Sequence, residues 1–291
     1  MDGFLLVDKA GGMTSHDVVA NIRRRFATKK VGHAGTLDPM ATGVLVLGVG
    51  DATRLLQFVV DGTKTYVATI SLGRSTITDD KEGEVIAIAD PKILARISDE
   101  EILERLKGMQ GKISQRPSSV SAVKIKGKTG HARVRSGEIF ELPSREVTIS
   151  SITVQGINRK DEEIAVDIVV TCSSGTYIRA IARDLGDLLE VGGHLTSLRR
   201  TMVSPFDISE CSDWQSAELI DTASGIGRIL PVRILELSEL IEISFGRAIP
   251  ANESAGAIAG LTGDGTFVAL LENQNVGEKS LARPTLVSMK E

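Results

Sequence analysis

The chain of 291 residues has a net charge of −4, and its 42% hydrophobic and 25% charged residues are typical of a soluble globular protein, long enough for one large and one small domain. No apolar run approaches the roughly 20 residues that span a bilayer, and the basic start of a signal peptide is missing, so we expect a cytoplasmic protein without membrane contact. Two cysteines and four widely separated histidines exclude a disulfide framework and a zinc-ligand spacing, so we expect no metal.

The first elements expected along the chain are a strand and a helix. Residues 5–7 are apolar throughout, which is typical of a short buried strand. Thr14 or Ser15 is a suitable N-cap for a helix whose apolar residues recur at helical spacing as far as Ile22. This helix is expected to end near the basic residues of 23–30.

Four later segments have a clear periodicity. Residues 65–72 and 164–171 alternate apolar and polar side chains, as half-buried strands do, and we assign both to a sheet. Between them, residues 100–109 predict a helix. Residues 177–189 follow a turn of small residues and predict an amphipathic helix with Arg179 in its first turn.

Basic side chains gather in two stretches although the chain as a whole is acidic. Residues 112–145 hold eight basic and two acidic side chains, a net charge of +6, and five more basic residues lie within 23–30. Because cations neutralise phosphates, this distribution indicates a local site for a polyanion. The glycine, serine and proline content of 112–145 predicts a long mobile excursion in place of a regular element, and such excursions are often binding loops.

The C-terminal part of the chain differs in composition. Residues 212–291 hold 6 basic and 11 acidic side chains, a net charge of −5. Glycines separate short apolar runs such as 267–271, a spacing typical of a small β-barrel or sandwich. We therefore place a domain boundary near residue 233, which divides the chain into domains 1–233 and 234–291.

Residues 32–45, GHAGTLDPMATGVL, place glycine and alanine around one carboxylate, Asp38. Small side chains let another backbone approach closely, and Pro39 fixes its own φ and keeps Asp38 out of the helical region. The carboxylate is therefore expected on a rigid, extended turn. Rigid presentation of an acid suits covalent catalysis, but Asp-Pro is also a common turn former, so the motif alone leaves a purely structural role open.

Two generic activities fit the sequence poorly. GVGDAT at 48–53 follows an apolar run as a dinucleotide-binding turn would, but it lacks the third glycine and the βαβ context, and we interpret it as a strand end. Glycoside hydrolysis at Asp38 needs a second carboxylate as general acid. Asp51 and Asp61 are available only if the fold brings them near.

Together with the Asp38 motif, several ordered segments resemble the TruB-type tRNA pseudouridine synthases, the enzymes that isomerise uridine 55 in the T-arm of tRNA. The resemblance runs in register over about residues 4–206. It implies an α+β fold with a mixed, mainly antiparallel sheet flanked by helices, Asp38 in a central cleft, and a small C-terminal β domain similar to PUA modules. The matching segments are FLLVDKAGGMTSHDVV, GHAGTLDPMATGVL, KTYVATISLG at 64–73, CSSGTYIRAIARDLG at 172–186 and GGHLTSLRRTMVSPF at 192–206.

The resemblance implies that Asp38 is the nucleophile, that Tyr66 stacks on the target base and can take its C5 proton, and that Arg179 pairs with Asp38. An aspartate is ionised at neutral pH and a guanidinium holds its orientation, so no separate base is needed. Attack at the ribose C1′, or proton removal at C2′ to give a glycal, detaches uracil as a delocalised anion, and the sequence leaves both steps open. The base then rotates and rejoins through C5, without any cofactor.

The resemblance also implies that the target base is turned out of the tRNA loop, which costs a few kcal/mol of unstacking. His33 is expected to fill the space that the nucleotide leaves, Leu198 to form an apolar wall, and residues 112–145 to close on the T-arm as an RNA-binding arm. The expected partner is tRNA, and we expect the protein to be a monomer. Candidates for substrate or RNA binding are His33, Tyr177, Leu198, Lys9, Lys124 and Lys126.

The chain departs from the family pattern at three positions: Ala10 replaces a usual proline, Val120 a frequent aromatic residue, and His131 a common tyrosine. The last two lie in the predicted arm, so the resemblance does not fix the precise RNA contacts of the arm. The acidic C-terminal domain argues against strong phosphate binding there. Two alternatives stay open: a protein whose main role is to refold tRNA, with the chemistry secondary, and a related synthase that acts on another RNA.

Overall fold

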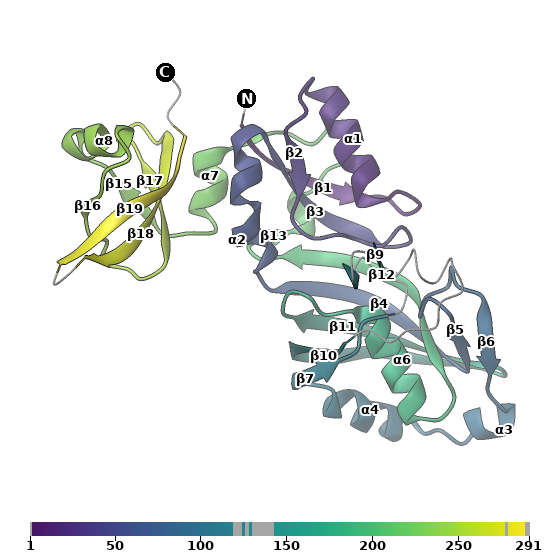
Figure 1. The fold of residues 1–291 in the computed structure, drawn as a ribbon. Helices are drawn as coiled ribbons and strands as arrows, with labels where there is room; N and C mark the ends of the chain where they lie inside the picture. Colours follow the sequence, from purple (N-terminus) through teal and green to yellow (C-terminus); the bar gives the residue numbers. More distant parts are fainter. Residues whose placement is uncertain (1, 119–123, 126–127, 130–142, 277–278, 289–291) are drawn as a thin grey trace.

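The computed structural model describes residues 2–118, 124–125, 128–129, 143–276 and 279–288 of the chain (Figure 1). These residues form a large mixed sheet flanked by helices, and a second, smaller sheet near the C-terminus. The α+β fold that the resemblance implies is therefore confirmed. Within the described residues, no helix has the length and apolar character needed to cross a membrane.

The ten-stranded main sheet is antiparallel at every pairing of its named strands except one. β12 runs parallel to β3, with Arg200 opposite Gly43, and antiparallel to β4 on its other side. This β3–β12 seam joins the N-terminal strands to the strands formed later in the chain. The strands across the sheet are β14 (Ile220–Asp221), β1 (Gly3–Lys9), β3 (Thr42–Val49), β12 (Gly193–Val203), β4 (Lys64–Leu72), β11 (Glu163–Cys172), β10 (Arg145–Lys160) and β7 (Gly111–Gln115), while β2 (Val31–His33) pairs with β3 and β13 (Phe206–Asp207) with β12.

The helix predicted near the N-terminus is α1 (Ser15–Arg25), and its N-cap is Thr14. The Thr14 hydroxyl accepts a hydrogen bond from the Asp17 N–H, and the Asp17 carboxylate accepts one from the Thr14 N–H. Such a cap stabilises a helix by about 1 kcal/mol. The apolar face of α1, including Val18 and Ile22, is fully buried against β1, β2 and β3. The predicted cap and apolar face are both confirmed.

The predicted strands at 65–72 and 164–171 are β4 and β11, which pair with each other. In β11 every second side chain is buried, as the alternation predicts. The segment GVGDAT is also a strand end as expected, because β3 ends at Val49 and a 3-10 helix, η1 (Gly50–Leu55), follows.

Helices α4 (Asp99–Gly108) and α6 (Ile178–Leu188) are the two helices predicted in this half of the chain. The Ser98 hydroxyl caps α4 by accepting from the Glu101 N–H at 3.1 Å. Both helices bury their apolar faces in one cluster with β4, β11 and β12. Figure 1 shows α4 near the β10 end of the sheet and α6 beside it, where α6 packs on β4 and β12. Because Tyr177 is the N-cap of α6, Arg179 lies in its first turn, where it was predicted.

A two-stranded hairpin, β5 (Arg74–Thr76) and β6 (Val85–Ile88), follows β4. The turn between its strands, residues 77–84, reaches back to β12, where Asp80 forms an isolated bridge with Leu195. The remaining short helices are α2 (Leu56–Val60), α3 (Pro91–Leu94), η2 (Ile208–Glu210) and α7 (Thr222–Gly227).

The prediction of an irregular excursion over 112–145 is wrong at both ends, where the chain is regular. β7 pairs antiparallel with the first residues of β10, with Gln115 opposite Arg145. β7 could not be predicted from the sequence because this edge strand carries a single apolar side chain, Ile113, among polar residues. Two short strands, β8 (Lys124–Ile125) and β9 (Lys128–Thr129), pair further along. Most other residues of this segment, beyond Ser118, lie outside the described residues.

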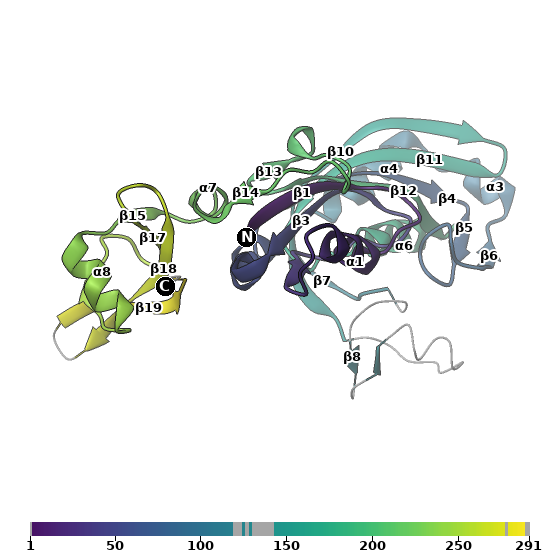
Figure 2. The ribbon, with the colours of Figure 1, turned by 90° about the horizontal axis from the view of Figure 1, so that it is seen from above.

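The second sheet confirms the small C-terminal β structure. Its strands follow the order β15-β17-β18-β19-β16, and Figure 2 shows it to one side of the main sheet, beyond α7. Apolar side chains of this sheet, among them Phe267 and Leu270, share a buried cluster with η1 and α2. The predicted boundary near residue 233 falls inside β15, and the division into domains and its PUA-like character stay predictions. The elements are β15 (Val232–Ile234), α8 (Leu237–Ser244), β16 (Ile249–Pro250), β17 (Ala257–Leu261), β18 (Phe267–Val276) and β19 (Lys279–Val287).

Candidate active site

Asp38 lies on the loop between β2 and β3, in the part of the chain where the sequence predicted a rigid turn. The Asp38 carbonyl accepts a hydrogen bond from the Ala41 N–H at 3.1 Å, which closes a turn with Pro39 as its second residue. Proline fixes the φ that this position of a β-turn requires. The Asp38 side chain remains 30% exposed. The predicted turn is therefore present, and the carboxylate is accessible from solvent.

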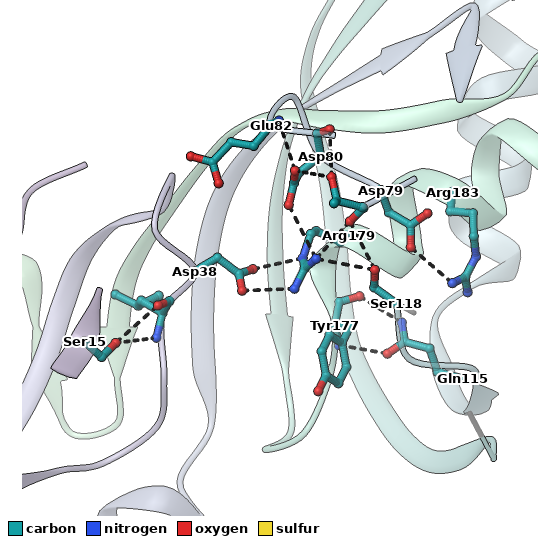
Figure 3. Close-up of polar contacts among 12 residues, drawn as sticks. Ser15, Asp38, Asp79, Asp80, Glu82, Gln115, Ser118, Tyr177, Arg179 and Arg183 are labelled. Atoms are coloured by element: carbon teal, nitrogen blue, oxygen red, sulfur yellow. Dashed lines mark hydrogen bonds and ion pairs between the residues drawn. The ribbon is translucent and has the colours of Figure 1, made fainter. Parts of the chain in front are cut away.

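The peptide groups on both sides of Asp38 are held by the N-terminal segment. The Ser15 hydroxyl accepts from the Leu37 N–H at 2.9 Å and donates to the Leu37 carbonyl at 3.2 Å (Figure 3). The Pro39 carbonyl accepts from the Gly12 N–H at 2.9 Å. These contacts fix the backbone around the carboxylate from residues more than twenty positions earlier. Sequence reasoning considered Ser15 only as a helix cap, and it missed this second role.

Arg179 contacts both oxygens of the Asp38 carboxylate. Its Nη2 donates to Oδ1 at 3.0 Å, and its Nε lies 3.0 Å from Oδ2 (Figure 3). The guanidinium is 4% exposed, so the pair has a buried cation and a partly exposed anion. A two-point contact of this kind fixes the direction of the carboxylate as well as compensating its charge. The pairing implied by the resemblance is present in the structure.

The other edge of the Arg179 guanidinium faces acceptors that the sequence did not single out. Its Nη1 donates to the Thr78 carbonyl at 2.9 Å, and lies 3.4 Å from both the Ser118 hydroxyl and Asp80 Oδ2. Asp80 is 6% exposed and is the nearest second carboxylate to the site on these contacts. Because it is buried against Arg179, it is poorly placed to act as a general acid. Asp51 instead pairs with Lys30 at the far end of β3.

Gly43 allows the close backbone approach that the motif predicted. Its φ is +103°, and a Cβ added there would lie 2.1 Å from the Arg200 carbonyl oxygen across the β3–β12 seam. The buried Arg200 side chain crosses back below the loop, where Nε donates to the Val44 carbonyl and Nη2 to the Gly35 carbonyl. Arg200 therefore ties β12 to both ends of the segment that carries Asp38.

Tyr66 and Leu198 lie on neighbouring strands, β4 and β12, and both are buried in one cluster with Leu37 and Met40 on the Asp38 loop. Burial raises the pKa of the Tyr66 phenol, while the charge of Arg200 and a hydrogen bond with it act in the opposite direction. The structure thus brings the predicted aromatic ring and apolar wall to the residues that flank Asp38. Their roles toward a base stay predictions.

Two buried lysines donate to backbone carbonyls, and one of them, Lys9, supports the Asp38 loop. Lys9 is 1% exposed, and its Nζ donates to the carbonyls of Met13 at 2.7 Å, Ala10 at 3.0 Å and Pro39 at 3.3 Å. Lys64 likewise donates to backbone carbonyls just before β4. Burial lowers the pKa of each lysine to about 8. Lys9 was predicted to bind RNA, but in this structure its ammonium is engaged by backbone and is not accessible to a phosphate.

His33 ends β2 and is partly buried below the loop. Its ring meets the His16 ring edge to face, with centroids 5.6 Å apart. Burial lowers the pKa of His33, and the nearby His16 and Arg200 lower it further. The imidazole is therefore neutral at pH 7, which suits a side chain that fills space. That role toward a flipped nucleotide stays a prediction.

Tyr177 is held at the start of α6 by Gln115 of β7. The Gln115 side chain accepts from the Tyr177 N–H at 2.8 Å and donates to its carbonyl at 3.0 Å (Figure 3). The Arg145 guanidinium lies over the Tyr177 ring, 4.5 Å from its centroid. Of the other RNA-binding candidates, Lys124 belongs to β8, where only the backbone is described, and Lys126 lies outside the described residues.

The arrangement provides an accessible carboxylate whose backbone is fixed and whose charge is compensated by a buried cation. Such a group can attack an electron-poor carbon without reorganising its surroundings. Within the described part of the chain, no group of three or more His, Cys, Asp or Glu side chains could hold a metal ion. The accessible Asp38 carboxylate lies beside the apolar and aromatic surface that Tyr66 and Leu198 form with Leu37 and Met40.

Comparison with protein families identifies the segments that build this site. Residues 23–178 match the TruB family pseudouridylate synthase N-terminal domain. Residues 179–224 match the tRNA pseudouridylate synthase B C-terminal domain, a region that ends before the second sheet begins. Together the two matches include the Asp38 loop, β4, α6 and β12.

Individual proteins give the same result. The chain is 47% identical to the tRNA pseudouridine synthase B of Paenarthrobacter aurescens (strain TC1), covering 99% of this chain and 95% of that protein. It is 49% identical to the tRNA pseudouridine synthase B of Rhodococcus jostii (strain RHA1), covering 94% and 90%. Its fold is similar to an H/ACA RNP bound to a substrate RNA containing 2'-deoxyuridine, with a TM-score of 0.71, 22% identity, and coverage of 99% of this chain and 85% of that one. A Cbf5-Nop10-Gar1 complex gives a TM-score of 0.69 at 25% identity, with coverage of 99% and 84%.

Proposed function

Because the chain belongs to the TruB family of pseudouridylate synthases, we propose that this isomerase converts uridine 55 in the T-arm loop of tRNA to pseudouridine. The observation that carries the proposal is the Asp38–Arg179 pair, in which an accessible carboxylate contacts a buried guanidinium at two points. The names of its relatives, tRNA pseudouridine synthase B, support tRNA as the substrate.

In the proposed reaction Asp38 starts the chemistry at the sugar. The carboxylate either attacks C1′ or removes a proton from C2′, and in both cases the C1′–N1 bond breaks and its electron pair leaves with uracil. Uracil leaves as a delocalised anion, so its departure needs less general-acid help than the departure of a sugar alcohol. Arg179 keeps the carboxylate in one direction while the charge moves from Asp38 to the base.

The freed uracil then turns, and its C5 bonds to C1′. On the first route the Asp38–C1′ ester breaks and releases the carboxylate; on the glycal route Asp38 returns its proton to C2′. The C5 proton is then lost. We assign Tyr66 primarily a stacking role in this step, because an aromatic face restrains a rotating base without fixing its angle. Burial raises the pKa of Tyr66, so the phenol is protonated in the resting enzyme. If Tyr66 takes the C5 proton, it must therefore pass its own proton on at the same time.

We propose that the uridine reaches Asp38 by leaving the tRNA loop. His33 then occupies the vacated position as a neutral ring, and Leu198 forms the apolar wall that excludes water from the reacting base. We propose that exposed basic residues at the C-terminal end of α1 contact phosphates. In this proposal the enzyme works as a cytoplasmic monomer, and the second sheet is a PUA-like module that contributes little charge attraction.

Release of tritium from C5-labelled uridine in a T-arm RNA tests the proposal, with no cofactor or metal added. We expect release by the wild type and none by Asp38→Asn, although that variant should bind the RNA with unchanged affinity. Asp51→Asn is the matched control, because Asp51 is a partly exposed aspartate that pairs with Lys30 away from the site. It should release tritium at the wild-type rate.

An RNA in which position 55 is cytidine and another loop uridine carries the label tests the choice of base. Release from that RNA would refute the specificity for uridine 55. Turnover by Asp38→Asn would refute the role of Asp38. A folded, RNA-binding wild type that releases no tritium would favour the tRNA-refolding role or another RNA substrate.

A further inference from the structure

Helix α6 carries two arginines, one turn apart, that contact the same two segments of the chain. Arg179 and Arg183 are four residues apart, so their side chains lie on one face of the helix. Arg179 contacts Asp38. Arg183 contacts Asp79, with Nη1 3.4 Å from Oδ2 (Figure 3). Asp79 directly precedes Asp80, the carboxylate that faces Arg179.

Arg183 also reaches the segment that follows β7. Its Nη2 donates to the Arg116 carbonyl at 2.8 Å. Two residues later, the Ser118 hydroxyl donates to the Thr78 carbonyl at 3.1 Å and lies 3.4 Å from Nη1 of Arg179. Arg183 therefore holds both segments that supply acceptors to the outer edge of Arg179, namely the turn of residues 78–80 and the segment 116–118.

Asp79 makes this arrangement dependent on Arg183. Its backbone has a φ of +59°, a conformation that costs most residues about 1–2 kcal/mol but that aspartate tolerates better. Its carboxylate is 12% exposed; burial raises its pKa, and the charges of Arg183 and Arg179 lower it. Arg179 is the other cation whose charge acts on this carboxylate when Arg183 is removed. Asp79 would then draw Arg179 away from Asp38.

We propose that Arg183 is a positioning residue for catalysis, which engages Asp79 and the Arg116 carbonyl so that Arg179 stays directed at Asp38. The neighbouring Asp184 binds Arg183 at Nε and Nη2 and helps to fix its fork, leaving Nη1 for Asp79. This role rests on the proposed function, because it concerns the same Asp38–Arg179 pair. In this proposal Asp79 and Arg183 do not touch the substrate themselves, but hold the residues that position Asp38 and Arg179.

The test combines Arg183→Gln with Asp79→Asn, alone and together. Single-turnover tritium release and the Kd for T-arm RNA are measured separately on folded protein, with circular dichroism and thermal unfolding as checks. A small displacement of a catalytic group costs about 10-fold to 100-fold in rate, so we expect Arg183→Gln to slow release by at least about 10-fold with Kd unchanged. Asp79→Asn keeps a residue that tolerates the positive φ, and it should change the rate little.

The double variant carries the decisive comparison. Once the Asp79 charge is removed, Asp79 no longer competes with Asp38 for Arg179, so Asp79→Asn should restore most of the rate that Arg183→Gln loses. Arg183→Lys keeps one cation beside Asp79 but cannot make both contacts, and its rate should be intermediate. Arg105→Gln is the matched control, because Arg105 is an exposed helix arginine that pairs only loosely, at 3.9 Å, with Glu101.

Each outcome decides between the explanations. Additive rate losses in the double variant, or an Arg183→Gln rate equal to that of the Arg105→Gln control, would overturn the positioning role. A weaker Kd with an unchanged rate would instead make Arg183 an RNA contact. Absence of tritium release by the wild type would count against the proposed function itself, and so remains distinguishable from failure of this inference.

Discussion

Replacement of Gly43 by alanine should damage the enzyme at the β3–β12 seam. Gly43 lies between Lys9 of β1 and Arg200 of β12 in the strand register, five residues after Asp38. Its φ is +103°, and an added Cβ would lie 2.1 Å from the Arg200 carbonyl oxygen. Gly12 is a suitable control, because its φ is +80° but no described atom lies within 4 Å of an added Cβ.

The two variants separate backbone strain from steric overlap. A positive φ costs alanine about 1–2 kcal/mol at either position. Overlap in a packed interior adds about 1–3 kcal/mol, and only at Gly43. We therefore expect Gly43→Ala to lower the free energy of unfolding by about 2–5 kcal/mol and Gly12→Ala by about 1–2 kcal/mol. The reduced entropy of the unfolded chain affects both variants equally.

Urea unfolding measures this difference directly. At an m value of about 2 kcal/mol/M, the Gly43→Ala midpoint should lie about 0.5–1.5 M below that of Gly12→Ala. Tritium release by Gly43→Ala should also fall, because separating β3 from β12 moves both Arg200 and the Asp38 loop. Equal midpoints for the two variants would refute the argument that close strand contact requires glycine at position 43.

Three further predictions concern charge and ionisation. The pKa of Lys9 is lowered to about 8 from 10.5, so between these values the unfolded chain holds more protons and the stability that this group contributes rises with pH. Urea unfolding at about pH 7.5 and about pH 9.5 should show this gain in the wild type relative to Lys9→Met. A stability difference between the two proteins that does not change with pH would contradict the prediction. Burial raises the pKa of Tyr66, one of two tyrosines, so an ultraviolet titration should show a late phenolate phase that Tyr66→Phe removes; persistence of that phase would refute the assignment. RNA affinity should fall steeply with salt. The variant Lys29→Gln, at an exposed lysine beside α1, should reduce the slope of log affinity against log salt concentration by about one, and an unchanged slope would exclude a phosphate contact there.

The elements of the fold could be predicted where short-range chemistry determines them. Thr14 caps α1 and the alternating residues of β4 and β11 form strands, because a cap and a pleat depend only on residues a few positions apart. β7 escaped prediction, since an edge strand need not alternate in polarity. Strand order, including the parallel pairing of β3 with β12, is a long-range property that no local pattern carries.

The candidate site shows the same limit. Asp38 stood out because its turn is encoded by adjacent residues, and its pairing with Arg179 followed only from the family resemblance. Asp80 and Ser118 were missed, because they reach Arg179 across 99 and 61 positions. Lys9 was read as an RNA contact, although the fold buries its ammonium among backbone carbonyls. The sequence shows that a lysine is present, but it does not show which groups will accept hydrogen bonds from its ammonium.

The β3–β12 seam also determines when the enzyme can first become competent. Asp38 and Arg179 are separated by 141 positions, and β12 follows Arg179 in the chain. At about 5–20 residues per second, a ribosome needs roughly 7–28 s to add the arginine after the aspartate. During that time the edge of β3 has no β12 to pair with, and the Asp38 carboxylate has no guanidinium to orient it. A nascent chain is therefore chemically silent toward RNA until α6 and β12 have been added.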